Sequence, residues 1–188
     1  GRAGISRATI PRMRRLALLS LVVLAAGSVS AQGPAPIDWT AVDAETLKHF
    51  TAIIQIYSTD PPTTPPGVEK PVVDYLRTVL EGAGIPTETV ALDPNRPNLV
   101  ARLKGNGKKR PLLLMAHTDT VNIDPKKWSL PPFSATRKDG YIYGRGTLDD
   151  KGMGVMNLLT MLLLKRHNVE LDRDVIAMYT CDEEIGSP

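Results

Sequence analysis

Hydrophobic positions along the chain follow two spacings, one typical of helices and one typical of strands. Apolar residues recur every three or four positions in residues 43–57 and 70–81, which predicts two amphipathic helices, the first capped by Asp43. Residues 154–164 are apolar almost all round, as in a helix packed deeply against a sheet. Strands are predicted at residues 87–91, 98–103, 112–116, 134–138, 141–143 and 175–179.

The strand pattern indicates the fold class. Residues 112–116 and 175–179 are nearly continuous apolar runs, which suits central strands covered on both faces by helices. Asp139-Gly140 between two short strands predicts a hairpin. Four prolines within residues 58–67 predict a loop. Together these features predict a layered α/β domain with a mixed, largely parallel central sheet between helices.

The N-terminal residues have the order of a signal peptide. Two arginines follow Met13, residues 16–26 are apolar, and small residues run to Ala31, after which cleavage is predicted. An uncut anchor is the alternative, but the apolar run is too short to span about 30 Å of hydrocarbon. We therefore expect a periplasmic or secreted protein with no stable membrane anchor. Residues 1–12 are then upstream sequence, residues 13–31 the signal peptide and residues 32–40 a flexible lead-in.

The charge of the mature chain argues against nucleic-acid binding, and its cysteine content excludes a disulfide-stabilised fold. The chain carries a net charge of +3, but removing residues 1–31 takes away five arginines and no acid, which leaves −2. The mature chain thus has no electrostatic reason to bind nucleic acid. Cys181 is the only cysteine, so an internal disulfide is excluded.

Three clusters of histidine and acidic residues lie where predicted elements meet. His117 and Asp119 follow one buried strand, Asp149-Asp150 precedes the buried helix, and residues 182–184 follow the other buried strand. Ligands of open α/β sheets bind beyond the carboxyl ends of the strands. At least two of the clusters should therefore converge on one edge of the sheet.

Each cluster taken alone has an ordinary structural explanation. His117 could be a satisfied buried histidine, Asp150 could cap the following helix, and Glu183-Glu184 could be an acidic turn. Together, however, the acidic clusters would repel one another unless a cation lay between them. An imidazole with several carboxylates is a ligand set that suits zinc.

A zinc site assigns a role to each cluster. His117 supplies a nitrogen ligand, and Asp119 holds the other N–H of its imidazole. A carboxylate such as Asp149 can bridge two metal ions. One of the paired glutamates would bind a metal while its neighbour takes a proton from the attacking water.

Residues 113–121, 143–152 and 182–187 resemble the signature blocks of a known family. This family comprises the aminoacylases, carboxypeptidase G and succinyl-diaminopimelate desuccinylase, which are co-catalytic zinc metallopeptidases. The resemblance covers residues 42–188. It implies that His117 binds one zinc, Asp149 bridges both, Glu184 binds the other and Glu183 is the general base. It also implies cobalt or manganese as substitutes and a cis peptide between Asp149 and Asp150.

The resemblance further implies an enzyme that hydrolyses amide bonds in small peptides or N-acyl amino acids, of carboxypeptidase, dipeptidase or deacylase type. Residues 41–188 would be the N-terminal portion of its catalytic domain. The remaining ligands and a smaller dimerisation or lid domain would lie beyond Pro188, so we expect a homodimer for the complete protein and an inactive fragment here. His49 and His167 are expected to be surface or partly buried residues that bind no metal.

Other function classes fit less well. The mature chain has no Gly-x-Ser-x-Gly motif of a serine hydrolase, and Gly144-Arg145-Gly146 lacks the third glycine of a nucleotide-binding loop. The main alternative is an exported, non-catalytic binding protein with a zinc-peptidase fold. The presence of Glu183 argues against it, because such a protein could lose this residue and keep its fold.

Overall fold

The computed structural model describes residues 36–59 and 68–186. The chain divides into two units, residues 1–33 and 34–188, and the described residues belong to the second. The predicted upstream residues 1–12, the signal peptide 13–31 and residues 60–67 of the proline loop lie outside them. The elements are α1 (Trp39–Gln55), α2 (Lys70–Gly82), β1 (Thr87–Val90), β2 (Asn98–Leu103), β3 (Leu112–His117), η1 (Pro125–Lys127), β4 (Thr136–Lys138), β5 (Tyr141–Tyr143), α3 (Lys151–Arg166), β6 (Val175–Thr180) and η2 (Glu183–Ile185).

Two helices begin earlier than their hydrophobic spacing predicts. Helix α1 begins at Trp39 because Asp38, rather than Asp43, is its N-cap and accepts a hydrogen bond from the Ala41 backbone at 3.1 Å. Helix α3 begins at Lys151, directly after Asp150. Its glycine at position 154 packs against Ala116 and Tyr179, so the helix comes close to the sheet there.

The main sheet has the order β1-β2-β6-β3, which confirms an α/β fold with a mixed sheet. Only β3 and β6 pair in parallel, whereas β1–β2 and β2–β6 are antiparallel. The expectation of a largely parallel sheet is therefore wrong for the described residues. The two nearly continuous apolar runs, β3 and β6, do form the parallel pair, whereas β1 and β2 extend the sheet in an antiparallel manner.

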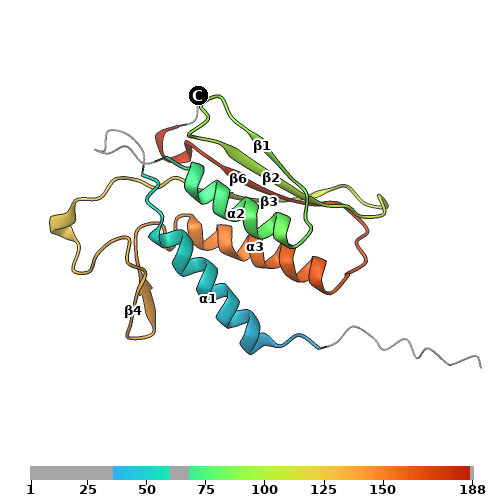
Figure 1. The fold of residues 1–188 in the computed structure, drawn as a ribbon, viewed down its shortest axis with the longest axis horizontal. Coiled ribbons are helices and arrows are strands. Elements are labelled where there is room, and N and C mark those ends of the chain that lie inside the picture. Colours follow the sequence, from blue (N-terminus) through green and yellow to red (C-terminus); the bar gives the residue numbers. More distant parts are fainter. Residues whose placement is uncertain (1–35, 60–67, 187–188) are drawn as a thin grey trace, which may run out of the picture. The chain divides into compact units, whose positions relative to one another are not determined.

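Helices of the described residues cover one face of this sheet (Figure 1). Helices α2 and α3 pack on the strands, and α1 packs against α3. The core between them includes Leu99, Ala101, Ala177 and Tyr179, each with no exposed surface. On the other face, Leu113 and Met115 of β3 are 47% and 52% exposed. The expected second layer of helices is thus not found among the described residues.

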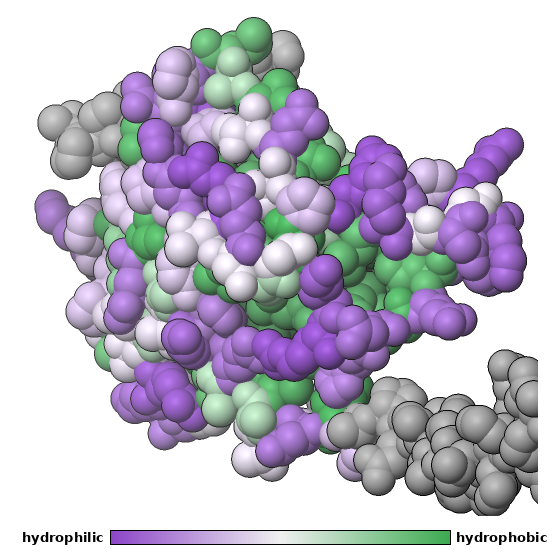
Figure 2. Space-filling view, turned by 45° about the vertical axis from the view of Figure 1, so that its right-hand side comes forward, coloured by the Kyte–Doolittle hydropathy of each residue, from purple (hydrophilic) through white to green (hydrophobic). Residues whose placement is uncertain are grey.

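The predicted hairpin is confirmed. Strands β4 and β5 pair in an antiparallel manner around Asp139 and Gly140, which both have positive φ. Elsewhere, hydrophilic side chains project over much of the face in Figure 2, with hydrophobic surface visible in the hollow between them. Among the described residues no helix is both long and apolar enough to cross a membrane.

Candidate metal centre

The parallel pairing of β3 and β6 brings two of the predicted clusters together. His117 at the end of β3 is in register with Thr180 at the end of β6. The Thr118 backbone N–H donates to the Thr180 carbonyl at 2.8 Å, which holds the two chain segments side by side beyond the sheet. Residues 117–119 and 182–184 therefore meet at one edge, as the rule for carboxyl ends of strands predicts.

Ligand atoms of His117, Asp149 and Glu184 lie within 4.8 Å of one another. Nε2 of His117 is 2.9 Å from Oδ1 of Asp149 and 3.9 Å from Oε2 of Glu183. The histidine is buried, whereas the side chains of Asp149 and Glu183 are 75% and 61% exposed. The group thus has a buried nitrogen donor and carboxylates that open towards solvent.

Asp119 connects the histidine to the acidic turn. This residue has no exposed surface, and its Oδ1 and backbone oxygen lie 3.3 Å and 3.1 Å from Nδ1 of His117. Its Oδ2 accepts the Glu184 backbone N–H at 2.9 Å. One carboxylate therefore orients both the imidazole and the turn that carries Glu183 and Glu184.

The His117 imidazole has a strongly shifted pKa. Burial opposes its charge, but hydrogen bonds to Asp119 and Asp149 outweigh this effect and raise the pKa to about 9. The Asp149 carboxylate, which stabilises a proton on Nε2, would stabilise a metal ion there. This local surplus of negative charge is compatible with a bound cation.

Asp149 reaches the cluster through a tightly shaped loop. The peptide bond between Asp149 and Asp150 is cis, as the family resemblance implies. Gly146 has a φ of +83°, and a Cβ there would lie 2.8 Å from Cγ2 of Thr120. A Cβ at Gly152 would lie 2.4 Å from the Thr147 carbonyl oxygen. Glycine is therefore required at both positions.

The structure resolves the alternative role of Asp150. It stands at the N-cap position of α3, but its side chain makes no capping hydrogen bond. Instead Oδ2 accepts the backbone N–H of His117 at 3.4 Å. Burial raises the pKa of Asp150, and Asp149 and Glu183 raise it further against the opposing effect of His117. This carboxylate supports the histidine rather than the helix.

Sequence reasoning missed two buried groups beside the site. Nζ of Lys151 donates to the carbonyl oxygens of Ile53 and Ile56 at 3.2 Å and 2.7 Å, which ties the end of α1 to the start of α3. Oγ of Ser58 donates to the Thr118 carbonyl at 2.7 Å. No local signal could have found these contacts, because the partners lie 60 or more residues apart in the sequence.

The other two histidines are remote from this group. His49 is only 4% exposed and its Nδ1 lies 2.8 Å from the Tyr75 hydroxyl, so the expectation of a surface or partly buried residue is wrong for this histidine. This part of α1 packs on the core through the neighbouring apolar residues Phe50, Ile53 and Ile54. His167 is the C-cap of α3. Neither belongs to the ligand group found among the described residues.

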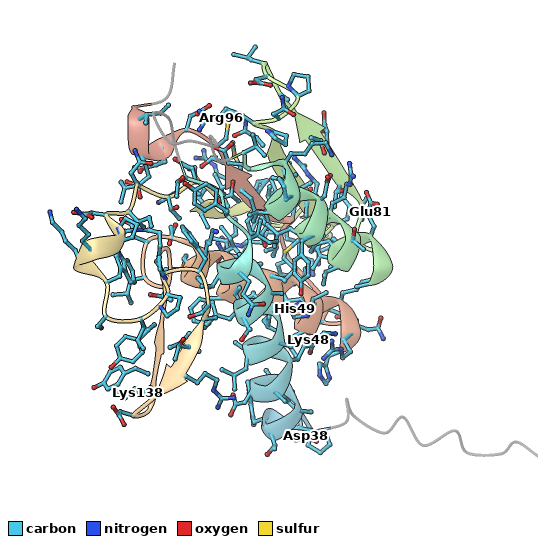
Figure 3. All side chains as sticks on the ribbon, turned by 60° about the vertical axis from the view of Figure 1, so that its left-hand side comes forward. Asp38, Lys48, His49, Glu81, Arg96 and Lys138 are labelled. Atoms are coloured by element: carbon cyan, nitrogen blue, oxygen red, sulfur yellow. The ribbon has the colours of Figure 1, made fainter. Side chains whose placement is uncertain are left out.

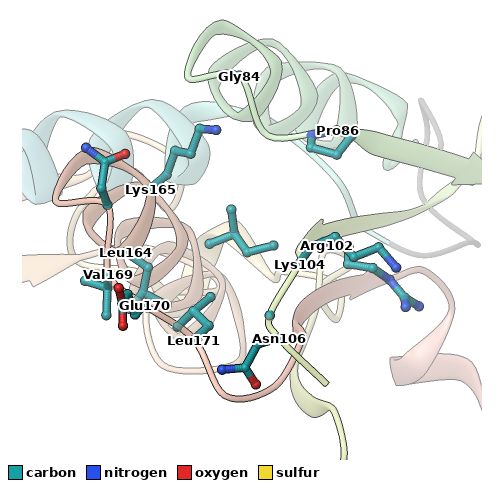
Figure 4. Close-up of a pocket in the computed structure, with 13 residues that line it drawn as sticks. Gly84, Pro86, Arg102, Lys104, Asn106, Leu164, Lys165, Val169, Glu170 and Leu171 are labelled. Carbon is teal, nitrogen blue, oxygen red and sulfur yellow. The ribbon is translucent and has the colours of Figure 1, made fainter. Parts of the chain in front are cut away.

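A large cavity lies at the opposite end of the sheet (Figure 4). It has a volume of about 770 Å³ and is lined by residues such as Arg102, Lys104, Lys165 and Leu171. Leu103 of the cavity lining pairs with Val175, the first residue of β6, whereas residues 182–184 of the candidate metal centre follow its last residue. The cavity lining includes no histidine and no aspartate, so this space is not the metal centre.

The ligand chemistry at His117, Asp149 and Glu184 fits zinc. One imidazole nitrogen and carboxylate oxygens form a typical zinc donor set, and hydrogen bonding at the second imidazole nitrogen is the usual support. The residues named from the sequence therefore come together, while their individual roles as ligands and base stay predictions.

Among curated proteins, the chain is similar to enzymes named as a deformylase and a deacetylase. The chain is 35% identical over 143 residues to N-formyl-4-amino-5-aminomethyl-2-methylpyrimidine deformylase of Halalkalibacterium halodurans, covering 74% of this chain and 34% of the relative. It is 33% identical over 140 residues to acetylornithine deacetylase of Vibrio campbellii, covering 74% and 35%.

The solved structures agree with this fold. The M20 family metallo-carboxypeptidase Sso-CP2 from Sulfolobus solfataricus matches with a TM-score of 0.66 and 30% identity, over 76% of this chain and 32% of that chain. Human carnosine dipeptidase 1 matches with a TM-score of 0.68 and 19% identity, over 79% and 34%, and so shows the fold alone. The chain spans about a third of the length of these relatives.

The family model supports the same assignment. The model described as peptidase family M20/M25/M40 matches residues 113–188, the part that contains all three clusters. This confirms the resemblance to the aminoacylase, carboxypeptidase G and desuccinylase family that the sequence blocks indicate. Residues 113–188 of this chain are therefore similar to peptidase family M20/M25/M40.

Proposed function

We propose that this chain is part of a zinc-dependent hydrolase that cleaves amide bonds in small peptides or N-acyl amino acids. The observation that carries the proposal is the convergence of His117, Asp149 and Glu184 within 4.8 Å, with Glu183 beside them. The relatives include a deformylase, a deacetylase and a carboxypeptidase, names that all imply attack on an acyl–nitrogen bond.

In this proposal His117, Asp149 and Glu184 would hold the metal. Bound zinc would supply a Lewis acid for the carbonyl and lower the pKa of water to about 7. Asp149 could also help to hold a second ion. Three ligand side chains are few for two ions, so residues 1–188 alone should bind metal weakly and turn over no substrate.

The protein's own groups then move the proton. Glu183 accepts a proton from the attacking water as the new C–O bond forms, and passes it to the nitrogen as the C–N bond breaks. Its exposed side chain is free to reach a substrate, unlike the buried Asp119. Asp119 keeps the imidazole and the Glu184 backbone in place throughout the reaction.

The test uses the full-length protein without residues 1–31. Zinc content is measured beside hydrolysis of a panel of dipeptides and N-acyl amino acids. Glu183→Gln should lower kcat by about 100- to 10,000-fold with zinc content unchanged, because only the proton acceptor is lost. Glu170→Gln is the matched control, since this exposed glutamate lies in the cavity at the other end of the sheet.

The outcomes separate the candidate functions. Zinc binding without turnover of any substrate would favour the non-catalytic binding protein. A protein that binds no metal would overturn the proposal. Equal activity in Glu183→Gln and the parent would remove Glu183 from the mechanism.

We also propose that the protein is exported by cleavage after Ala31. N-terminal sequencing of the protein recovered outside the cytoplasm would begin at Gln32 on this proposal. A first residue within positions 13–31 would contradict it.

A further inference from the structure

An arginine from a distant loop reaches the acidic turn of the candidate metal centre. Arg96 lies between β1 and β2, beside the segment that follows β6 (Figure 3). Its Nη2 is 2.6 Å from Oδ1 of Asp182 and 2.6 Å from Oε1 of Glu69. Its Nε is 3.2 Å and 3.1 Å from the two carboxylate oxygens of Glu69. One guanidinium therefore joins the start of α2 to the turn after β6.

Glu69 is the buried member of this arrangement, and its partners are partly buried. Glu69 is 1% exposed, and the side chains of Arg96 and Asp182 are 14% and 16% exposed. Burial raises the pKa of Glu69, while Arg96 acts in the opposite direction. A buried carboxylate of this kind needs a close cationic partner. The planar guanidinium can serve two carboxylates at once, which an ammonium does less well.

Backbone contacts fix the loop from which Arg96 extends. The Arg96 N–H donates to the Asp93 carbonyl at 2.9 Å, and the Lys70 N–H donates to the Asn95 carbonyl at 3.1 Å. The loop is therefore tied to the start of α2 independently of the Arg96 side chain. It forms a rigid base for a contact to Asp182.

The position of Asp182 decides where the two glutamates point. Asp182 has φ of 60° and ψ of 21°, a left-handed conformation, and directly precedes η2, which contains Glu183 and Glu184. A non-glycine residue in this region needs support from its surroundings. The turn is held on one side by Asp119, through the Glu184 N–H, and on the other by Arg96, through the Asp182 carboxylate.

We propose that Arg96, anchored by Glu69, is a positioning residue that orients Glu183 and Glu184 through Asp182. This inference rests on the proposed function. Loss of the contact would let the turn rotate away from His117 and Asp149. Both metal affinity at Glu184 and proton transfer at Glu183 would then decrease, although Arg96 takes no part in the chemistry.

The test compares Arg96→Gln with Arg102→Gln in the full-length protein. Arg102 is the matched control, because it also pairs with an aspartate, Asp174 at 3.1 Å, but at the far end of β2. Co²⁺ affinity is measured by titration, the visible spectrum of bound Co²⁺ reports ligand geometry, and kcat and KM are measured separately. Arg96→Gln should weaken Co²⁺ binding by about 10- to 100-fold, alter its spectrum and lower kcat more than it changes KM. Arg96→Lys should restore part of the loss, and Arg102→Gln should match the parent.

A second variant guards against simple unfolding of Arg96→Gln. Asp182→Asn removes the charge at the turn and leaves the Glu69–Arg96 pair intact, so it should fold and show the same changes to a smaller extent. Parent-like Co²⁺ affinity, spectrum and kcat in Asp182→Asn and Arg96→Gln would overturn this inference alone. A parent protein that binds no metal would overturn the proposed function together with it.

Discussion

Two histidines of this chain are buried, and their surroundings differ in charge. His117 at the end of β3 is 8% exposed and lies beside Asp119 and Asp149. His49 in α1 is 4% exposed and lies beside the Tyr75 hydroxyl, with Glu45 at 3.9 Å. The two sites are similar in burial, yet the pKa moves in opposite directions.

The direction of the shift follows from the neighbouring carboxylates. At His117 the carboxylates outweigh burial and raise the pKa to about 9. At His49 burial dominates and lowers the pKa below 6.5, although Glu45 acts against it. A buried histidine is thus a candidate metal ligand when carboxylates surround it, and a structural residue when one hydroxyl satisfies it. Burial alone does not distinguish the two.

Replacing each histidine in turn tests this difference, and the largest expected effect is on zinc binding. In the full-length protein His117→Gln should weaken zinc binding by more than about 100-fold, because losing a ligand exceeds the effect of losing an outer partner. Turnover should be lost with the metal. Zinc content after dialysis and kcat measure this, with His49→Gln as the control that keeps both. Loss of zinc in both variants would remove the distinction between the two sites.

His49→Gln should lower the stability of the fold, an effect smaller than the loss of zinc binding in His117→Gln. The variant should keep the candidate metal centre intact. The variant loses the contact between Nδ1 and the Tyr75 hydroxyl, which joins α1 to α2. The free energy of unfolding should decrease by about 1–2 kcal/mol, the usual cost of a lost internal hydrogen bond. Urea unfolding at neutral pH measures it. An unchanged unfolding midpoint would show that this contact adds nothing to the packing of the two helices.

The smallest expected effect is a pH dependence that belongs to His49. Its folded pKa lies below 6.5, so below that pH the unfolded chain binds more protons. The contribution of His49 to the free energy of unfolding should therefore decrease as pH falls from 7.5 to 5.0, so the difference in this free energy between the parent and His49→Gln should decrease with it. Glu45 and Lys48 of α1, Tyr75 of α2 and Arg166 of α3 are the charged or titratable groups near this histidine.

Glu45 should contribute little to the pH dependence of the free energy of unfolding in this range. Its hydrogen bonds to Arg166 lower its pKa below 4.5, so it stays ionised in this pH range. Identical slopes in the parent and His49→Gln would assign the pH dependence to other groups.

Several elements could be predicted from the sequence because their information is local. Strand β2 and strand β5 have the predicted bounds, and the Asp139-Gly140 turn forms the expected hairpin. The start of α1 was wrong because two aspartates, Asp38 and Asp43, could each have capped it, and the hydrophobic spacing does not choose between them. The direction of β2 was also out of reach, since β2 is antiparallel to β6 although β3, on the other side of β6, is parallel to it.

The sequence by itself determined the identity of the candidate site residues. His117, Asp149, Glu183 and Glu184 stand in three short blocks, and the chemistry of those residue types already indicates a cation. Only the tertiary structure decided what holds them. Arg96, Lys151 and Asp150 act on groups 33 or more residues away, through contacts that no local pattern encodes. The physical reason is that ligand type is a property of single residues, whereas burial and hydrogen bonding arise only when distant segments pack together.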